Sequence, residues 1–232
     1  MCRAVVVAAL IAGCHAELGG ATSGLSADAG SGGPAGACSN GRVVYLVFEG
    51  VTLTKAATDA TANHAAWLGM TTATVPPYHA GASNRSGQIQ SITSQVRDHL
   101  SSFPITVVTT RPAAGPYVMV ALGGERGDVG TQYSYATGDH DCGDQVKSDV
   151  VWVSDVVPDG KVADNAIGAI AWALGLNGTN SPADCMCGWS NNCVQSSSAC
   201  TLSSSIATTS NAACAGLATQ DEVSAFHQAF CE

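Results

Sequence analysis

The feature that most constrains the fold is an uninterrupted apolar run, VVYLVF, at residues 43–48. Valine and aromatic residues favour strands, and a strand without polar alternation is typical of one that is covered on both faces. We therefore predict a central β-strand here. Three further runs of this kind, separated by Pro and Gly turns, predict strands at residues 105–110, 117–122 and 150–156.

Two segments have the spacing of helices. At residues 86–103 the apolar side chains recur three and four positions apart, and the segment ends before Pro104. Residues 162–176 form an Ala-rich pattern that is closed by Gly175 and Gly178. The order strand, helix, three strands, helix predicts an α/β (α+β) sandwich with a mixed, mostly parallel sheet and two main helices.

The N-terminus predicts export. A basic start, an apolar run at residues 4–12 and the sequence IAGC resemble a bacterial lipobox, in which Cys14 is lipidated after residues 1–13 are removed. An ordinary secretory peptide or a buried strand is the alternative. His15 is not the Asp that retains lipoproteins at the inner membrane of enteric bacteria, so we expect an outer-membrane or cell-surface location. Residues 14–41, rich in Gly, Ala and Ser, predict a flexible tether.

The ten cysteines agree with export. Without Cys2 in the leader and Cys14 at the lipid, an even set of eight remains, and an even number in an exported chain predicts disulfides. Residues 187–232 are therefore expected to form a Cys-rich, bridged region packed on the same domain. The eight disulfide candidates are Cys38, Cys142, Cys185, Cys187, Cys193, Cys200, Cys214 and Cys231.

The sequence AIAWALGLNGTNSPADCM, residues 169–186, resembles part of a zinc protease motif. In the metzincins a helix carries His-Glu-x-x-His, a Gly lets the chain turn, a third His completes the zinc site, and a Met lies under it. Here Gly175 falls on the motif Gly and Met186 on the Met-turn, as in the matrix metalloproteases. The upstream order of elements also resembles this family, which implies a zincin-like domain over residues 42–186. The alternative is coincidence, since an Ala-rich helix can end in Leu-Gly-Leu with Gly175 as its cap.

The four positions that carry the chemistry in that family differ here. Gly168 and Trp172 stand at the two helical His positions, Ala169 at the Glu, and Gly178 at the third His. Gly and Ala have no donor atom for a metal, and an indole N–H only donates a hydrogen bond. A catalytic zinc needs about three protein ligands. We therefore expect no catalytic residue and no cofactor, with Trp172 in the space of the metal and Gly168 relieving crowding.

One other cluster is a candidate metal site. In GDHDCGD, residues 138–144, the side chains of His140, Asp141 and Asp144 lie within five positions, and such groups can bind zinc or another metal. We favour the simpler interpretation, a Gly-rich turn that a disulfide at Cys142 holds in place.

The remaining candidates are isolated. Cys185, Cys187 and Cys193 lack the paired Cys-x2-Cys knuckles of a structural zinc site. The other histidines form no recognisable pair: His64 shares one face of a short helical pattern with Trp67, His79 lies in a loop, and His227 belongs to a last helix that begins with a capping box, Thr219 to Glu222, and packs through Val223, Phe226 and Phe230.

The formal charge of −9 with nine basic residues disfavours nucleic acid as a partner, because binding to phosphates needs clustered Lys and Arg. Two classes of function stay open. The first is a membrane-anchored pseudo-metalloprotease that binds a peptide, a glycan or another envelope protein. The second is a metal-dependent peptidase or hydrolase, with zinc at a relocated site near His140.

Overall fold

The structure is a computed structural model, and it describes residues 42–209, 214 and 218–231. The predicted leader, the tether, Cys14 and Cys38 lie outside the described residues. Within the described part, no helix is long and apolar enough to cross a membrane.

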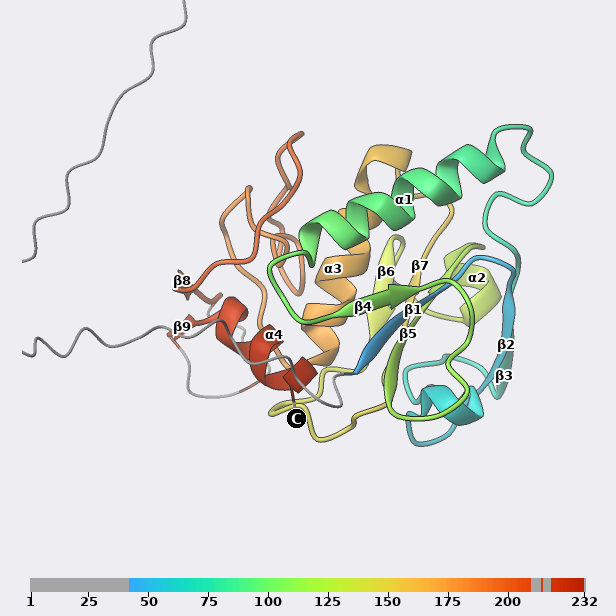
Figure 1. Cartoon of the computed structure of the whole chain (residues 1–232), viewed down its shortest axis with the longest axis horizontal. Helices are drawn as coiled ribbons and strands as arrows, with labels where there is room; N and C mark the ends of the chain where they lie inside the picture. Colours follow the sequence, from blue (N-terminus) through green and yellow to red (C-terminus); the bar gives the residue numbers. More distant parts are fainter. Residues whose placement is uncertain (1–41, 210–213, 215–217, 232) are drawn as a thin grey trace, which may run out of the picture. The chain divides into compact units, whose positions relative to one another are not determined.

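A five-stranded sheet forms the centre of the fold (Figure 1). Its order is β4 (Thr106–Val108), β1 (Val43–Val47), β5 (Tyr117–Leu122), β7 (Val150–Val153) and β6 (Ala136–Gly138). The first four strands are parallel, and β6 pairs antiparallel with β7. The predicted mixed, mostly parallel sheet is confirmed, and β1 lies inside the sheet as its apolar run predicts.

Both faces of the sheet are covered, which is why its strands lack polar alternation. In β5, Val118, Val120 and Leu122 face one core, while Tyr117, Met119 and Ala121 face another, and all six are buried. The helices α1 (Arg85–His99) and α3 (Val162–Ala173) pack on the first face.

Both helices end earlier than the pattern predicts. Beyond α1 the chain turns, with Phe103 N donating to Leu100 O at 3.0 Å, and Pro104 disfavours a helical conformation of Phe103, which precedes it. α3 ends in a Schellman motif: Gly175 has φ +85°, its N–H donates to Trp172 O, and Leu176 N donates to Ala171 O, both at 3.0 Å.

A hairpin that the sequence did not predict covers the second face. It consists of β2 (Val51–Thr54) and β3 (Thr72–Val75), with the 3-10 turn η1 (Ala60–Ala62) between them. The helical pattern proposed for His64 and Trp67 is wrong, since both follow η1 in bridges and turns. Trp67 Nε1 instead donates to Val150 O at 2.7 Å, which fastens this segment to the sheet. Residues 42–173 also contain the short helix α2 (Arg126–Val129) and the 3-10 turn η2 (Asp159–Lys161).

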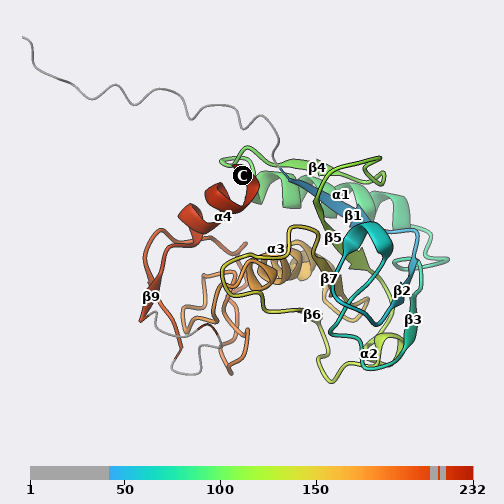
Figure 2. The ribbon, with the colours of Figure 1, turned by 90° about the horizontal axis from the view of Figure 1, so that it is seen from below.

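The C-terminal region has little regular structure before its last helix. It contains β8 (Ile206–Ala207), β9 (Thr219–Gln220) and α4 (Glu222–Cys231), and Figure 2 shows α4 and the neighbouring loops on the side of α3 away from β2 and β3. Three disulfides confirm the prediction of bridges, and Cys231 is disulfide-bonded as well. The three pairs are Cys142–Cys214, Cys185–Cys200 and Cys187–Cys193.

The start of α4 corrects the capping-box prediction. Asp221, not Thr219, caps the helix, because its Oδ1 accepts a hydrogen bond from Ser224 N at 2.8 Å. Thr219 belongs to β9, and Glu222 is fully buried. The predicted packing of Phe226 and Phe230 is confirmed, since both are buried in the core that includes α3.

Candidate functional site

The candidate site lies where α3 ends and the chain returns past it. Gly168 and Trp172 lie one turn apart on α3, and they therefore share one face of the helix. After the turn at Gly175, the buried Gly178 leads into a loop, and Thr179 N donates to Met186 O at 3.1 Å. Met186 is fully buried in the core that contains α3. The structure thus brings the motif positions and Met186 into one region.

Trp189 packs directly against Gly168 and Gly178, the two glycines that stand at His positions of the motif. A Cβ atom on Gly168 would lie 2.3 Å from Trp189 Nε1 and 2.8 Å from Cys185 O. A Cβ atom on Gly178 would lie 1.7 Å from Trp189 O. Carbon atoms do not approach other atoms this closely, so neither position accepts a histidine while Trp189 keeps its place.

Three rings form an aromatic stack, which we define as His140, Trp172 and Trp189. His140 and Trp172 stack with ring centroids 3.8 Å apart, and Trp172 and Trp189 with centroids 5.6 Å apart. Burial lowers the pKa of His140, which favours the neutral ring. His140 Nε2 lies 3.0 Å from Leu176 O, and because a carbonyl only accepts, this nitrogen carries the proton.

A small disulfide loop holds Trp189 in position. The Trp189 loop, residues 187–193, is closed by the Cys187–Cys193 disulfide. Asn191 ties it down: its Nδ2 donates to Thr179 O at 2.9 Å, and its Oδ1 accepts from Gly188 N and Cys193 N at 3.1 and 2.8 Å. The loop is therefore ordered independently of the stack. Sequence reasoning missed Trp189, although two cysteines six positions apart around Gly and Asn are the signal of a tight loop.

A buried carboxyl pair, Asp184 and Glu222, connects the loop at Met186 to α4. Asp184 Oδ1 accepts from Met186 N at 2.8 Å, and its Oδ2 accepts from Ser203 Oγ at 3.1 Å. Glu222 Oε2 accepts from Ser203 N at 2.9 Å, and its Oε1 accepts from Gln220 Nε2 at 2.8 Å. Burial, followed by the neighbouring Asp184 carboxylate, raises the pKa of Glu222 to about 8, so Glu222 is protonated at neutral pH.

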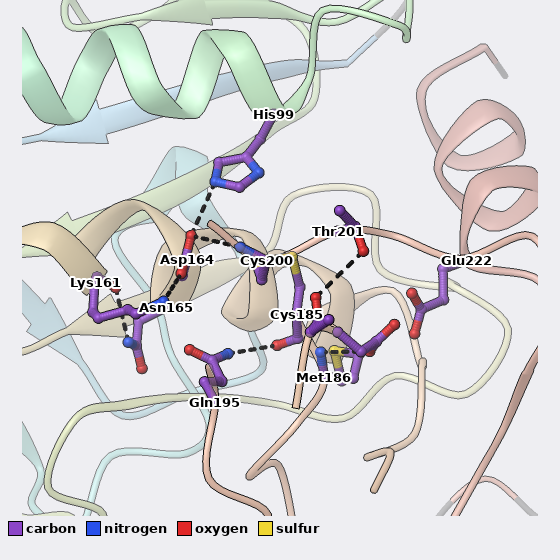
Figure 3. Close-up of a disulfide and its surroundings, with 12 residues drawn as sticks. His99, Lys161, Asp164, Asn165, Cys185, Met186, Gln195, Cys200, Thr201 and Glu222 are labelled. Atoms are coloured by element: carbon purple, nitrogen blue, oxygen red, sulfur yellow. Dashed lines mark hydrogen bonds and ion pairs between the residues drawn. A yellow bond between two sulfur atoms is a disulfide. The ribbon is translucent and has the colours of Figure 1, made fainter. Parts of the chain in front are cut away.

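A second histidine lies near another disulfide. His99 Nε2 is 3.0 Å from Asp164 Oδ1, and Lys161 Nζ donates to Asp164 Oδ2 at 2.7 Å (Figure 3). Burial alone would raise the pKa of Asp164, but the hydrogen bonds from His99 and Lys161 outweigh it and lower that pKa. This network fastens α1 to the start of α3, and Cys200 N joins it by donating to Asp164 Oδ1 at 3.3 Å.

Among the residues that the structure describes, two groups of side chains are compact enough to hold a metal ion, with ligand atoms within 4.8 Å of one another. In each group the two sulfurs are joined in a disulfide, which is not the thiolate that zinc binds. The oxidised chain therefore offers one histidine nitrogen at each place. The groups are His99 with Cys185 and Cys200, and His140 with Cys142 and Cys214.

The sequence candidates His140, Asp141 and Asp144 do not converge. His140 Nε2 bonds to Leu176 O, and Asp141 Oδ2 accepts from Val146 N at 2.6 Å. Asp144 forms ion pairs with the buried Arg42 and with Lys147. The three polar groups thus serve three separate contacts. Cys142 does pin this turn, through its disulfide to Cys214.

No protein-family model and no curated protein matches the chain. The disulfides indicate an oxidising compartment, which for most organisms means an exported protein.

Proposed function

We propose that the chain is a catalytically inactive metzincin-like protein, a pseudo-metalloprotease, which serves the cell envelope as a binding or structural module. The order of elements supports this proposal, because a mostly parallel sheet with two helices on one face is what the family resemblance implies. The turn at Gly175 and the burial of Met186 agree with it as well.

One observation carries the proposal: Trp189 occupies the space next to Gly168 and Gly178. In the family that this chain resembles, the corresponding positions carry zinc ligands, whereas here neither position has room for a Cβ atom. A histidine side chain at position 168 or 178 would therefore overlap the Trp189 loop. The site has been rebuilt around aromatic packing, and Trp172 and Trp189 together take up the space that the sequence assigned to Trp172 alone.

The alternative, a metal-dependent hydrolase with a relocated site near His140, has no comparable support. Ligands for one zinc ion must point at one position about 2 Å from each donor. His140, Asp141 and Asp144 each bond to a different partner, and His140 is stacked on Trp172.

Among the proposed ligands, an extended peptide fits the exposed edge of the sheet at β6 best. The edge strand β6 follows Tyr133 and Tyr135, each of which is 54% exposed. An edge strand offers main-chain groups to an added strand, and exposed Tyr side chains supply contact area beside it. A glycan or an envelope protein are further partners of the proposed module.

The proposed location is the outer membrane or the cell surface, through a lipid on Cys14. In a test, labelled fatty acid is expected in the wild-type chain and not in Cys14→Ala. Labelling that persists in the variant would remove the lipid anchor from the proposal while leaving the pseudoprotease assignment intact.

A metal and activity assay tests the assignment itself. The natively oxidised chain is purified, its zinc content is measured, and it is incubated with a mixture of unstructured peptides with and without a chelator. We expect far less than one zinc per chain and no chelator-sensitive cleavage. About one zinc per chain, together with cleavage that the chelator abolishes, would overturn the proposal.

A further inference from the structure

A cavity of about 340 Å³ lies between the N-terminal part of α1 and η2. Its size is at the lower end of the range for small-molecule sites. None of its lining residues belongs to the aromatic stack or to the Trp189 loop. A ligand bound here would therefore occupy a site separate from the edge strand β6, and a saccharide in it would deepen the proposed function, which already includes a glycan as a partner.

The wall on α1 is a row of polar side chains. Asn84, Gln88, Ser91 and Gln95 line the cavity, and their spacing of four, three and four residues places them on one face of the helix. The side chain of Asn84 makes no capping hydrogen bond to α1. Gln95 Nε2 donates to Ser91 Oγ at 2.9 Å, so the amide oxygen of Gln95 and the hydroxyl proton of Ser91 can face a ligand.

The opposite wall is held in place by residues behind it. Gln88 Nε2 donates to Asp159 Oδ2 at 2.7 Å, which bridges the two walls. Gln88 Oε1 lies 3.0 Å from His79 Nδ1, and the hydroxyl of the buried Tyr78 lies 3.5 Å from Asp159 Oδ1. These contacts fix the amide and the carboxylate before a ligand arrives, and such preorganisation favours affinity.

The chemistry of the walls selects for uncharged hydroxyl groups. Asp159 is the single ionisable residue among those that line the cavity, and no Lys or Arg lines it, so anions are disfavoured. Amides and a serine hydroxyl both donate and accept hydrogen bonds, and a carboxylate accepts them, so the walls offer both kinds of partner that sugar hydroxyls require.

We propose that the cavity between α1 and η2 binds a neutral saccharide unit, with hydroxyl groups held by Gln88, Gln95 and Asp159.

A larger side chain at position 87 would block the cavity. Gly87 lines it, and a Cβ atom there would meet nothing within 4 Å, so Gly87→Leu places a side chain at the cavity without a clash in the fold. Gly127, on α2, is a matched control, since a Cβ atom there also meets nothing within 4 Å and the residue does not line the cavity.

The test is an NMR titration of the full, natively oxidised chain with glucose and with maltose. We expect saturable shifts of backbone amides in the first half of α1 and in η2. Binding should weaken by roughly tenfold or more in Gly87→Leu, a loss of about 1.4 kcal/mol, and stay unchanged in Gly127→Leu. Tighter binding of maltose than of glucose would indicate that the natural ligand is a glycan chain. Equal binding of the two sugars would indicate that it is a free sugar.

Three results would overturn the proposal. The first is the absence of saturable shifts with either sugar. The second is binding that Gly87→Leu leaves unchanged. The third is a titration in which lysine or inorganic phosphate, used as comparison probes, shifts these amides while the sugars do not.

Discussion

Residues 42–173 and residues 174–231 build the same core by different means. The first part contributes strands and helices whose apolar residues recur with regular periods. The described residues of the second part form two strands of two residues each and one helix, yet Met186, Cys200 and Phe226 are buried in the core that contains α3. Disulfides and buried polar pairs supply the order there. Where periodic apolar side chains are few, covalent links and specific hydrogen bonds determine the conformation.

The largest expected effect comes from the carboxyl pair in the second part. The pKa of Glu222 rises from 4.5 to about 8 on folding, so its contribution to stability is complete below about pH 4.5 and is lost as the pH rises toward 8. We expect Glu222 alone to lower the free energy of unfolding in urea by on the order of 4 kcal/mol between about pH 5 and pH 8.

Glu222→Gln is the matched variant, because it keeps the shape but does not titrate. Its unfolding free energy should fall less between these pH values. A fall of similar size should persist in the variant, since burial also raises the pKa of Asp149 from 3.8 to about 8. An identical pH profile in wild type and variant would show that Glu222 is ionised in the folded chain.

The disulfides should differ in their contribution according to the length of chain that they close. Cys142–Cys214 closes 72 residues and links the two parts, whereas Cys187–Cys193 closes 6. Loop-closure entropy predicts a loss of about 4 kcal/mol for the double Ala variant of the first pair and about 2 kcal/mol for the second. Denaturant unfolding measures both, and a larger loss for the short loop would contradict this account of the second part.

Trp189→Ala is expected to cost about 3 kcal/mol, because it removes a large ring from the stack and leaves a cavity against Gly168. Trp189→Phe keeps an aromatic ring and should lose less. Thermal or urea unfolding of the two variants makes the comparison. Equal stability of wild type and Trp189→Ala would show that this side chain does not pack on α3 in solution.

The smallest expected effects come from Ala substitutions of two glycines in helices. Gly168→Ala should destabilise by about 2 kcal/mol, because its Cβ overlaps Trp189 and Cys185 O. Gly87→Ala, on α1, should stabilise by about 0.5 kcal/mol, since its Cβ meets nothing and Ala favours a helix. Urea midpoints of the two variants give the result, and shifts in the same direction would argue that the space beside Gly168 is open.

The sequence predicts the first part better than the second, for physical reasons. β5 has the predicted bounds, because its continuous apolar run is buried on both faces. α3 lies within its predicted segment and α1 begins one residue before its own, because each helix buries a periodic apolar face. The strands β2, β3 and β6 were missed, since they have three or four residues and mix Thr with apolar residues. Such short runs carry too little periodicity to separate a strand from a loop.

The candidate site depends on contacts that periodicity does not encode. Trp172 was found because a helical motif places it, whereas Trp189 reaches Gly168 only through the Cys187–Cys193 loop. Eight cysteines allow 105 pairings, so spacing alone could not assign this loop. The prediction of a capping box was wrong for a related reason. The sequence from Thr219 to Glu222 fits the pattern of such a box, but Glu222 interacts with Asp184, which is distant in sequence.

A crystal structure of the natively oxidised chain, from crystals soaked in zinc, tests the central claim most directly. The account predicts that the Trp189 ring lies against Gly168, stacked on Trp172, with no ion between α3 and Met186. A zinc ion in that position, with Trp189 turned away and protein ligands around the metal, would contradict it.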